Sequence, residues 1–169
     1  MKIKSFLHLI DAINERVGRF VAFLIIPISV ITVLEVILRY IFNRPTIWAW
    51  DMNLMLMGAF TILAGGYVLL KGGHVAIDMY TVRLSPRRRA MVDLITSALF
   101  FISVGLLLWQ SVISAFESVQ KREIINSIWG PPLYPLKILW PIGAFLLLIQ
   151  GMVKFIRDLA VIYSKEDRD

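Results

Sequence analysis

The stretch LITSALFFISVGLLLWQSVISAF, residues 94–116, decides the fold because it contains no charged side chain. Asp93 and Glu117 bound it on either side. About 20 consecutive apolar residues are enough for a helix to cross the hydrocarbon core of a bilayer. The stretch MNLMLMGAFTILAGGYVLL, residues 52–70, is equally free of charge. We therefore predict that both stretches cross a membrane as helices.

Two further apolar blocks lie outside these stretches, and both carry charges near their ends. Overall, 58% of the 169 residues are apolar and the mean hydropathy is +0.73, whereas a soluble domain is about 45–50% apolar. The composition predicts an all-α membrane protein that forms a single membrane domain, residues 1–169. Its four transmembrane helices are expected at about 17–42, 50–70, 91–116 and 136–158.

The residues before the first span, 2–16, have an amphipathic pattern of their own. Charged side chains take one face, and apolar side chains recur on the other at three- and four-residue spacing: Ile3, Phe6, Leu7, Ile10 and Ile13. This pattern is typical of a helix that lies in the membrane interface. We predict an N-terminal amphipathic interfacial helix; the alternative is that it extends the first span into the cytoplasm.

The distribution of lysine and arginine predicts the orientation. Thirteen of them lie in the N-terminal segment, the second loop and the C-terminal segment, which share one side if the chain has four spans, and five lie on the other side. The positive-inside rule then places both termini in the cytoplasm. Arg87, Arg88 and Arg89 are expected to anchor the second loop to inner-leaflet lipids. Basic residues that flank spans in this way indicate membrane lipids as partners, and no nucleic acid.

The sequence argues against most kinds of catalytic or metal centre. The chain has no cysteine, which excludes disulfides and thiolate chemistry. Its two histidines, His8 and His74, lie on different segments, which disfavours a haem or zinc site held by both. We therefore expect no cofactor, no metal and no catalytic residue.

Tryptophans gather at the predicted outer boundary of the spans: Trp48, Trp50, Trp129 and Trp140. Indole rings favour the headgroup region, so an aromatic belt is the ordinary interpretation. The alternative is that this dense outer belt is a docking surface for a partner.

Glu35 and Arg39 need explanation because charges are costly inside a predicted span. Four residues apart on a helix, they share a face and can form an ion pair, and Tyr40 follows them. The alternative is that they belong to an ion or proton pathway. Asp51 opens the second span, where the helix dipole favours a carboxylate; contact with Arg39 or Arg44 is a further possibility.

The segment KGGHVAID, residues 71–78, leaves the second span through two glycines. If the chain is helical beyond them, His74 and Asp78 share a face. A His–Asp pair can act as general acid and base, but no nucleophile or third ligand is near in the sequence. We favour a structural hydrogen bond at the cytoplasmic boundary.

Several short motifs follow one another along the chain: Glu35-x-x-x-Arg39-Tyr40, Asn43-Arg44-Pro45, Trp48, Asp51, Gly65-Gly66-Tyr67 and His74-Val75-x-x-Asp78. With four spans in so short a chain, this order resembles the DctQ-like small membrane subunit of TRAP (tripartite ATP-independent periplasmic) transporters, over roughly Val17 to Arg157. The ending Trp129-Gly130-Pro131-Pro132-Leu133-Tyr134-Pro135-Leu136-Lys137 with Gln150-Gly151 is similar to the mannitol/chloroaromatic branch. Two departures are Asp51, where the family usually has Glu, and Trp50, where a smaller or polar residue is more usual.

The resemblance implies a non-enzymatic role in the inner, or cytoplasmic, membrane of a bacterium or archaeon. In the family, a large membrane subunit carries the substrate and sodium sites and moves like an elevator. A periplasmic binding protein delivers the substrate, commonly an organic acid. The small subunit widens the static scaffold against which the large subunit works.

This role predicts structural or subunit-interface positions, and no substrate-binding residue in this chain. The expected positions are Glu35, Arg39, Tyr40, Trp48, Asp51, His74 and Asp78. The alternative function, suggested by the size of the chain and by Glu35, is a stand-alone homo-oligomeric four-helix transporter.

Overall fold

The computed structural model describes residues 2–72 and 86–163, and the side chains of residues 5–72 and 96–161. It consists of helices α1 (Lys2–Ala22), α2 (Ile25–Tyr40), α3 (Ala49–Leu70), α5 (Pro86–Lys121) and α6 (Tyr134–Tyr163). Within these described residues, four helical stretches are long and apolar enough to cross a membrane: Ser5–Tyr40, Ala49–Leu70, Thr96–Lys121 and Tyr134–Val161. The prediction of an all-α protein with four spans and an N-terminal helix is therefore confirmed.

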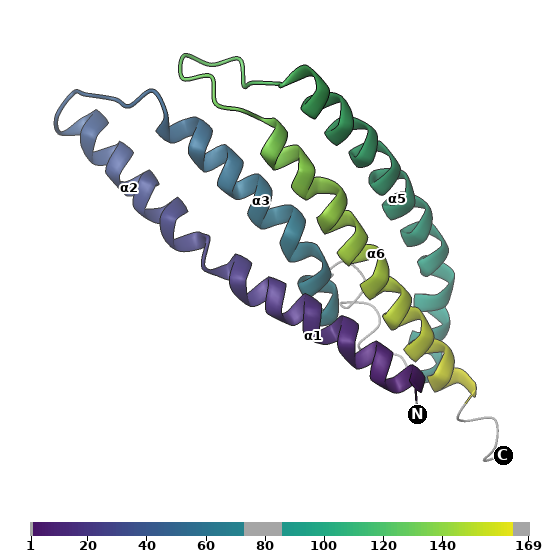
Figure 1. Ribbon diagram of the computed structural model, residues 1–169. Helices are drawn as coiled ribbons and strands as arrows, with labels where there is room; N and C mark the ends of the chain where they lie inside the picture. Colours follow the sequence, from purple (N-terminus) through teal and green to yellow (C-terminus); the bar gives the residue numbers. More distant parts are fainter. Residues whose placement is uncertain (1, 73–85, 164–169) are drawn as a thin grey trace.

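The helices lie side by side in one curved layer, in the order α1 with α2, then α3, α6 and α5 (Figure 1). Helix α6 packs between α3 and α5, and α2 packs mainly against α3. The connections α2–α3 and α5–α6 lie at one end of the layer, and the N-terminus and the end of α6 lie at the other (Figure 1). A single layer leaves a large part of every helix uncovered by the chain itself.

The first span is interrupted at Phe23 and Leu24, so the break does not fall at the expected boundary after residue 16. The cause is Pro27, which has no N–H to donate to the Phe23 carbonyl four residues earlier and whose ring crowds that carbonyl. The Phe23 oxygen accepts instead from the amide of Ile26, at 3.1 Å. Beyond the break, α2 continues almost in line with α1 (Figure 1), as expected for an N-terminal helix that extends the first span.

The centre of the layer is the crossing of α3 and α6. A Cβ added to Gly143 of α6 would lie 2.5 Å from the carbonyl oxygen of Ile62 in α3, so the two backbones are almost in contact. A Cβ added to Gly58 of α3 would meet the side chain of Leu136 in α6 at ordinary van der Waals distance. Small residues allow such close packing of helices in lipid. The packed pair of α3 and α6 supports the site described below.

Candidate subunit interface

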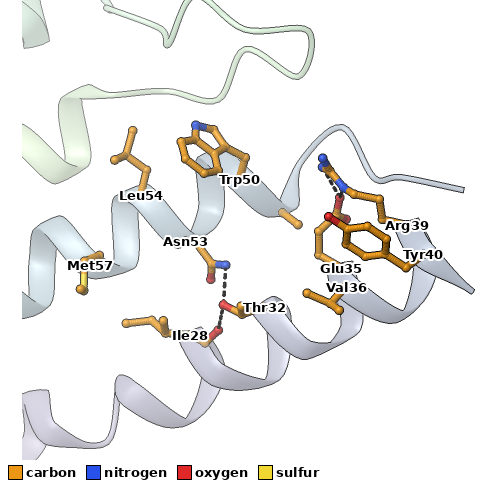
Figure 2. Close-up of a pocket in the computed structure, with 11 residues that line it drawn as sticks. Ile28, Thr32, Glu35, Val36, Arg39, Tyr40, Trp50, Asn53, Leu54 and Met57 are labelled. Carbon is orange, nitrogen blue, oxygen red and sulfur yellow. Dashed lines mark hydrogen bonds and ion pairs between the residues drawn. The ribbon is translucent and has the colours of Figure 1, made fainter.

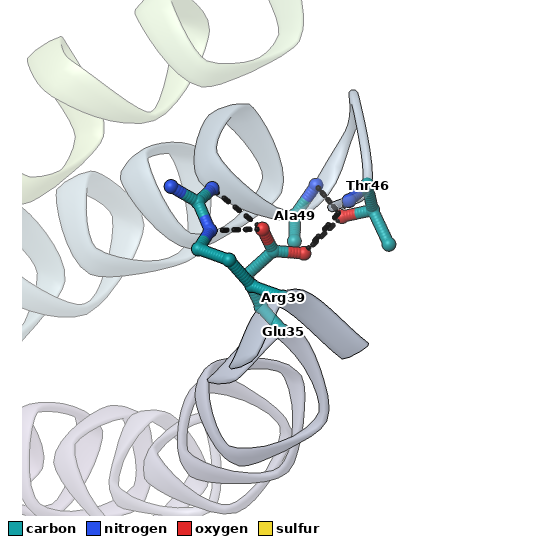
Figure 3. A network of polar contacts seen from close by, with 4 residues as sticks. All are labelled: Glu35, Arg39, Thr46 and Ala49. Carbon is teal, nitrogen blue, oxygen red and sulfur yellow. Dashed lines mark hydrogen bonds and ion pairs between the residues drawn. The ribbon is translucent and has the colours of Figure 1, made fainter. Parts of the chain in front are cut away.

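The Glu35 carboxylate lies near the C-terminal end of α2 and holds two segments together (Figure 3). Its Oε1 accepts hydrogen bonds from Arg39, with distances of 2.6 Å to Nη2 and 3.0 Å to Nε. Its Oε2 accepts from the hydroxyl of Thr46 at 2.5 Å and from the Thr46 amide at 3.1 Å. The predicted pair of Glu35 and Arg39 is present, and Glu35 also fastens α2 to the loop before α3.

Thr46 has a second role, which the sequence analysis missed. Its hydroxyl oxygen accepts a hydrogen bond from the amide of Ala49, the first residue of α3, at 3.3 Å. Thr46 precedes Trp48, the N-cap residue of α3, and its side chain thus satisfies one of the amides that the first turn of the helix leaves free. The bond to Ala49 could have been predicted, because a threonine lies three residues before an apolar helix. The contact of Thr46 with Glu35 could not, because it depends on the path of the loop.

The motif Asn43-Arg44-Pro45 ends α2 in a compact turn. Asn43 adopts the left-handed conformation, with φ of +50°, which asparagine tolerates better than most residues. The amide of Arg44 then donates to the carbonyl of Leu38 at 2.9 Å, as in a helix C-terminal cap. Pro45 cannot continue a helix. The turn therefore directs the chain toward Thr46 and into reach of Glu35.

A groove of about 490 Å³ separates α2 from α3 (Figure 2). Apolar side chains line most of it, and the lining includes Val36, Leu54 and Met57. Tyr40 and Trp50 also line it and are 76% and 77% exposed, so they are free to cover a partner. Helix α2 itself has no buried residue. This helix is therefore the least covered element of the bundle.

Two polar side chains bridge the groove at mid-length (Figure 2). Asn53 of α3 donates from Nδ2 to the hydroxyl oxygen of Thr32 at 3.0 Å, and Thr32 donates to the carbonyl of Ile28 at 2.7 Å. The buried Oδ1 of Asn53 has no hydrogen-bond partner among the described residues. A buried acceptor without a partner is costly, so this bridge stabilises the contact of α2 and α3 less than its two hydrogen bonds alone would suggest.

Asp51 lies beside the groove, in the first turn of α3, and is 4% exposed. Its Oδ2 accepts a hydrogen bond from Ser127 at 2.5 Å, and the Ser127 hydroxyl accepts from the amide of Gly130 at 3.0 Å. Asp51 thus anchors the loop between α5 and α6, and Ser127 is the partner that the sequence analysis missed. Trp48, half-buried, is the residue that precedes α3.

The loop of residues 122–133 is an ordered cap over this end of the layer. The amide of Ile125 donates to the carbonyl of Pro131 at 2.9 Å, and the amide of Leu133 donates to the carbonyl of Glu123 at 2.8 Å. Lys137 also pairs with the Glu123 carboxylate at 2.6 Å. This hydrogen bond from Lys137 is the main reason that the pKa of Glu123 lies below its ordinary value.

A second polar network lies at the opposite end of the bundle and was not predicted. Asn14 of α1 is 1% exposed, and its Nδ2 donates to Oε1 of Gln150 in α6 at 2.8 Å. Gln150 donates in turn to Asp11 at 3.0 Å, and Asp11 pairs with Arg157. The sequence could have suggested this network, because an asparagine lies on the apolar face of α1 and a glutamine lies within the apolar block of α6.

For the remaining predicted positions, the structure describes either the backbone alone or neither backbone nor side chain. His74 and Asp78 fall outside the described residues. Arg87, Arg88 and Arg89 belong to the first turns of α5, but their side chains are not among those described. In the part of the chain that is described, no three His, Cys, Asp or Glu side chains gather as a metal site would require.

These features define a small all-α membrane protein that crosses the bilayer several times and whose polar networks join segments of the chain itself. Residues 28–161 match the family described as tripartite ATP-independent periplasmic transporters, DctQ component. The match covers most of the chain, and the chain belongs to this family. The family is a transporter component, not an enzyme family. No curated protein matches the chain.

Proposed function

We propose that the chain is the static scaffold subunit of a TRAP transporter that imports an organic acid together with sodium, in the mannitol/chloroaromatic branch. A large membrane subunit would carry the substrate, and a periplasmic binding protein would deliver it. The observation that carries this proposal is the single helical layer, whose outermost helix α2 has no buried residue. A layer of this kind is completed by packing against another membrane subunit.

The polar groups of the described residues support a structural rather than a transporting role. Glu35 is held by Arg39 and Thr46, Asp51 by Ser127, and Gln150 by Asn14 and Asp11. Each set joins two segments of this chain. A substrate or sodium site would instead require several polar groups that converge on one cavity.

We further propose that the groove between α2 and α3 receives a helix of the large subunit. Its apolar wall would pack against that helix. Tyr40 and Trp50 would close over the contact, while Glu35, Arg39, Trp48 and Asp51 fix the groove's outer end. His74 and Asp78 are assigned the same structural role at the other membrane boundary.

Co-purification with the large subunit tests this interface. Met57→Trp fills the groove and should abolish recovery of the complex, while the purified chain keeps its helical circular dichroism. Leu106→Trp, on the exposed face of α5 at the other edge of the layer, is the matched control and should leave recovery unchanged. Normal recovery of the Met57→Trp complex would show that the large subunit binds elsewhere.

Reconstitution into vesicles separates this function from that of a stand-alone homo-oligomeric transporter. The chain alone should give no sodium-dependent uptake from a panel of radiolabelled organic acids. Addition of the large subunit and the binding protein should restore uptake. Uptake by this chain alone would overturn the scaffold role.

A further inference from the structure

A second groove lies along α1, between α1, α3 and α6. Its volume is about 590 Å³. Ten of its eleven lining side chains are apolar, including Val17 and Phe20 of α1, Leu63 of α3 and Ile142 of α6. The eleventh is Arg16. The groove is therefore an apolar channel with one cationic side chain in its wall.

The ion pair of Lys71 with Glu15 fixes the depth of Arg16. Lys71 is the residue at which α3 ends, and its Nζ lies 3.4 Å from Oε1 of Glu15. Arg16 is the next residue along α1, about 1.5 Å further on. At the boundary where the second span ends, an arginine can keep its guanidinium among the lipid headgroups while its methylene groups lie on apolar surface.

Among the described side chains around the groove, the positive charges outnumber the negative ones. The nearby acidic side chains are already engaged, Glu15 with Lys71 and Asp11 with Arg157. Arg16 and Arg19 are three residues apart on the same helix and both are exposed. Among the side chains that the structure describes, no acidic partner is recorded for either of them. Two positive charges beside an apolar channel complement an anionic head that carries an apolar tail.

We propose that this groove binds an anionic phospholipid. One acyl chain lies against Val17, Phe20 and Ile142, and the phosphate accepts hydrogen bonds from Arg16, with Arg19 close by on the next turn. Guanidinium groups suit this role because their paired N–H groups match two phosphate oxygens. A second copy of the chain is a poorer occupant, since a two-fold contact here would bring four guanidinium groups together with no free acid between them.

Native mass spectrometry of the full-length chain tests the proposal, with phosphatidylglycerol and phosphatidylethanolamine of identical acyl chains as probes. The chain should retain phosphatidylglycerol in preference. Arg16→Ala with Arg19→Ala should lower this preference about tenfold, the effect of losing a charge-assisted hydrogen bond. Arg44→Ala removes an exposed arginine at the opposite end of the bundle and should keep the preference. Equal retention of phosphatidylglycerol by the double variant overturns the proposal.

A second variant tests the channel separately from the charge. Val17→Trp fills the groove but leaves both arginines, and it should release the lipid; retention would contradict the assignment. Soluble glycerol 3-phosphate should not displace the lipid, because displacement would mean that the headgroup alone is bound. Lipid bound to the isolated chain but absent from its complex with the large subunit would mean that the subunit covers this groove. Arg16→Gln with Arg19→Gln replaces the alanine pair if that pair loses helical circular dichroism.

Discussion

Near the C-terminal end of α2, the Glu35 carboxylate accepts hydrogen bonds from two directions, and this arrangement explains how a charge is tolerated within an apolar span. Arg39 neutralises its charge from the same helix, while Thr46 satisfies the other oxygen from the loop. An ion pair that is exposed on one side stabilises little on its own. The hydroxyl of Thr46, which also accepts from the first amide of α3, therefore decides how firmly α2 is fixed.

Thr46→Val should lower the free energy of unfolding by about 1–2 kcal/mol, because at constant shape it removes a hydrogen bond to a carboxylate and the acceptor of the Ala49 amide. Thermal unfolding in detergent measures the change. Thr61→Val is the matched control, since Thr61 is an exposed residue of α3 and the substitution should be nearly neutral. Equal melting temperatures for the two variants would contradict the role assigned to Thr46.

Glu123 and Lys137 should make the loop of residues 122–133 sensitive to acid. The pKa of Glu123 is lowered in the folded protein, so the pair stabilises the fold above about pH 4.5 and this contribution is lost as the pH falls through the folded-state pKa. Wild-type protein should therefore lose melting temperature more steeply between about pH 6 and pH 3 than Glu123→Gln, which has no carboxylate to titrate. Parallel curves for the two proteins would show that the pair does not stabilise the fold.

At the scale of helices, packing rather than capping determines which elements are rigid. Helices α3 and α6 approach closely at Gly143, and α6 is also held by α5 on its other side. Helix α1 is fixed to α6 through Asn14 and Gln150. Among the described residues, the polar contacts that fix helix α2 to α3 and the loop before it are the Glu35 network and the bridge from Asn53 to Thr32.

Gly143→Ala should destabilise the bundle by about 1–3 kcal/mol, because the new methyl group meets the Ile62 carbonyl, which is backbone and cannot turn aside. Gly105→Ala in α5 is the matched control: nothing lies within 4 Å of the added Cβ. There the substitution should stabilise the helix by about 0.5–1 kcal/mol through reduced backbone entropy. The same sign of change for both variants, read from thermal unfolding, would contradict the close approach of α3 and α6.

The helices could be predicted from the sequence because a bilayer admits few other backbone structures, so long uncharged runs identify the spans. The break at Phe23 and Leu24 was also readable in principle, from Pro27. The contacts of Thr46 with Glu35 and of Ser127 with Asp51 were not, since each depends on how a loop folds back in space. Neither was the choice of Gln150 as partner of Asn14, which depends on the relative positions of α1 and α6.

At the scale of the whole molecule, the layer has two distinct ends. One carries the loops of residues 41–48 and 122–133, and the other carries the N-terminus and the end of α6 (Figure 1). An even number of spans requires both termini to lie on one side, and the excess of basic residues on that side predicts that it is the cytoplasm.

Labelling of single cysteines tests the orientation, since the natural chain has no cysteine. Ile128→Cys lies in the loop of residues 122–133, where Ile128 is 88% exposed. It should react in intact cells with a maleimide that cannot cross the inner membrane. Ser5→Cys, exposed near the start of α1, should react only after the membrane is permeabilised. The reverse pattern would place the termini outside.

The interruption of the first span has a mechanical consequence. The part before the break is fastened to α6 through Asn14 and Gln150, whereas the part after it is fastened to the loop before α3 through Glu35 and Thr46. Between these two attachments the ladder of helical hydrogen bonds is broken at Pro27. The two parts of the first span are thus held by separate attachments on either side of the broken turn, so that loosening the Glu35 network would release α2 while α1 stays fixed to α6.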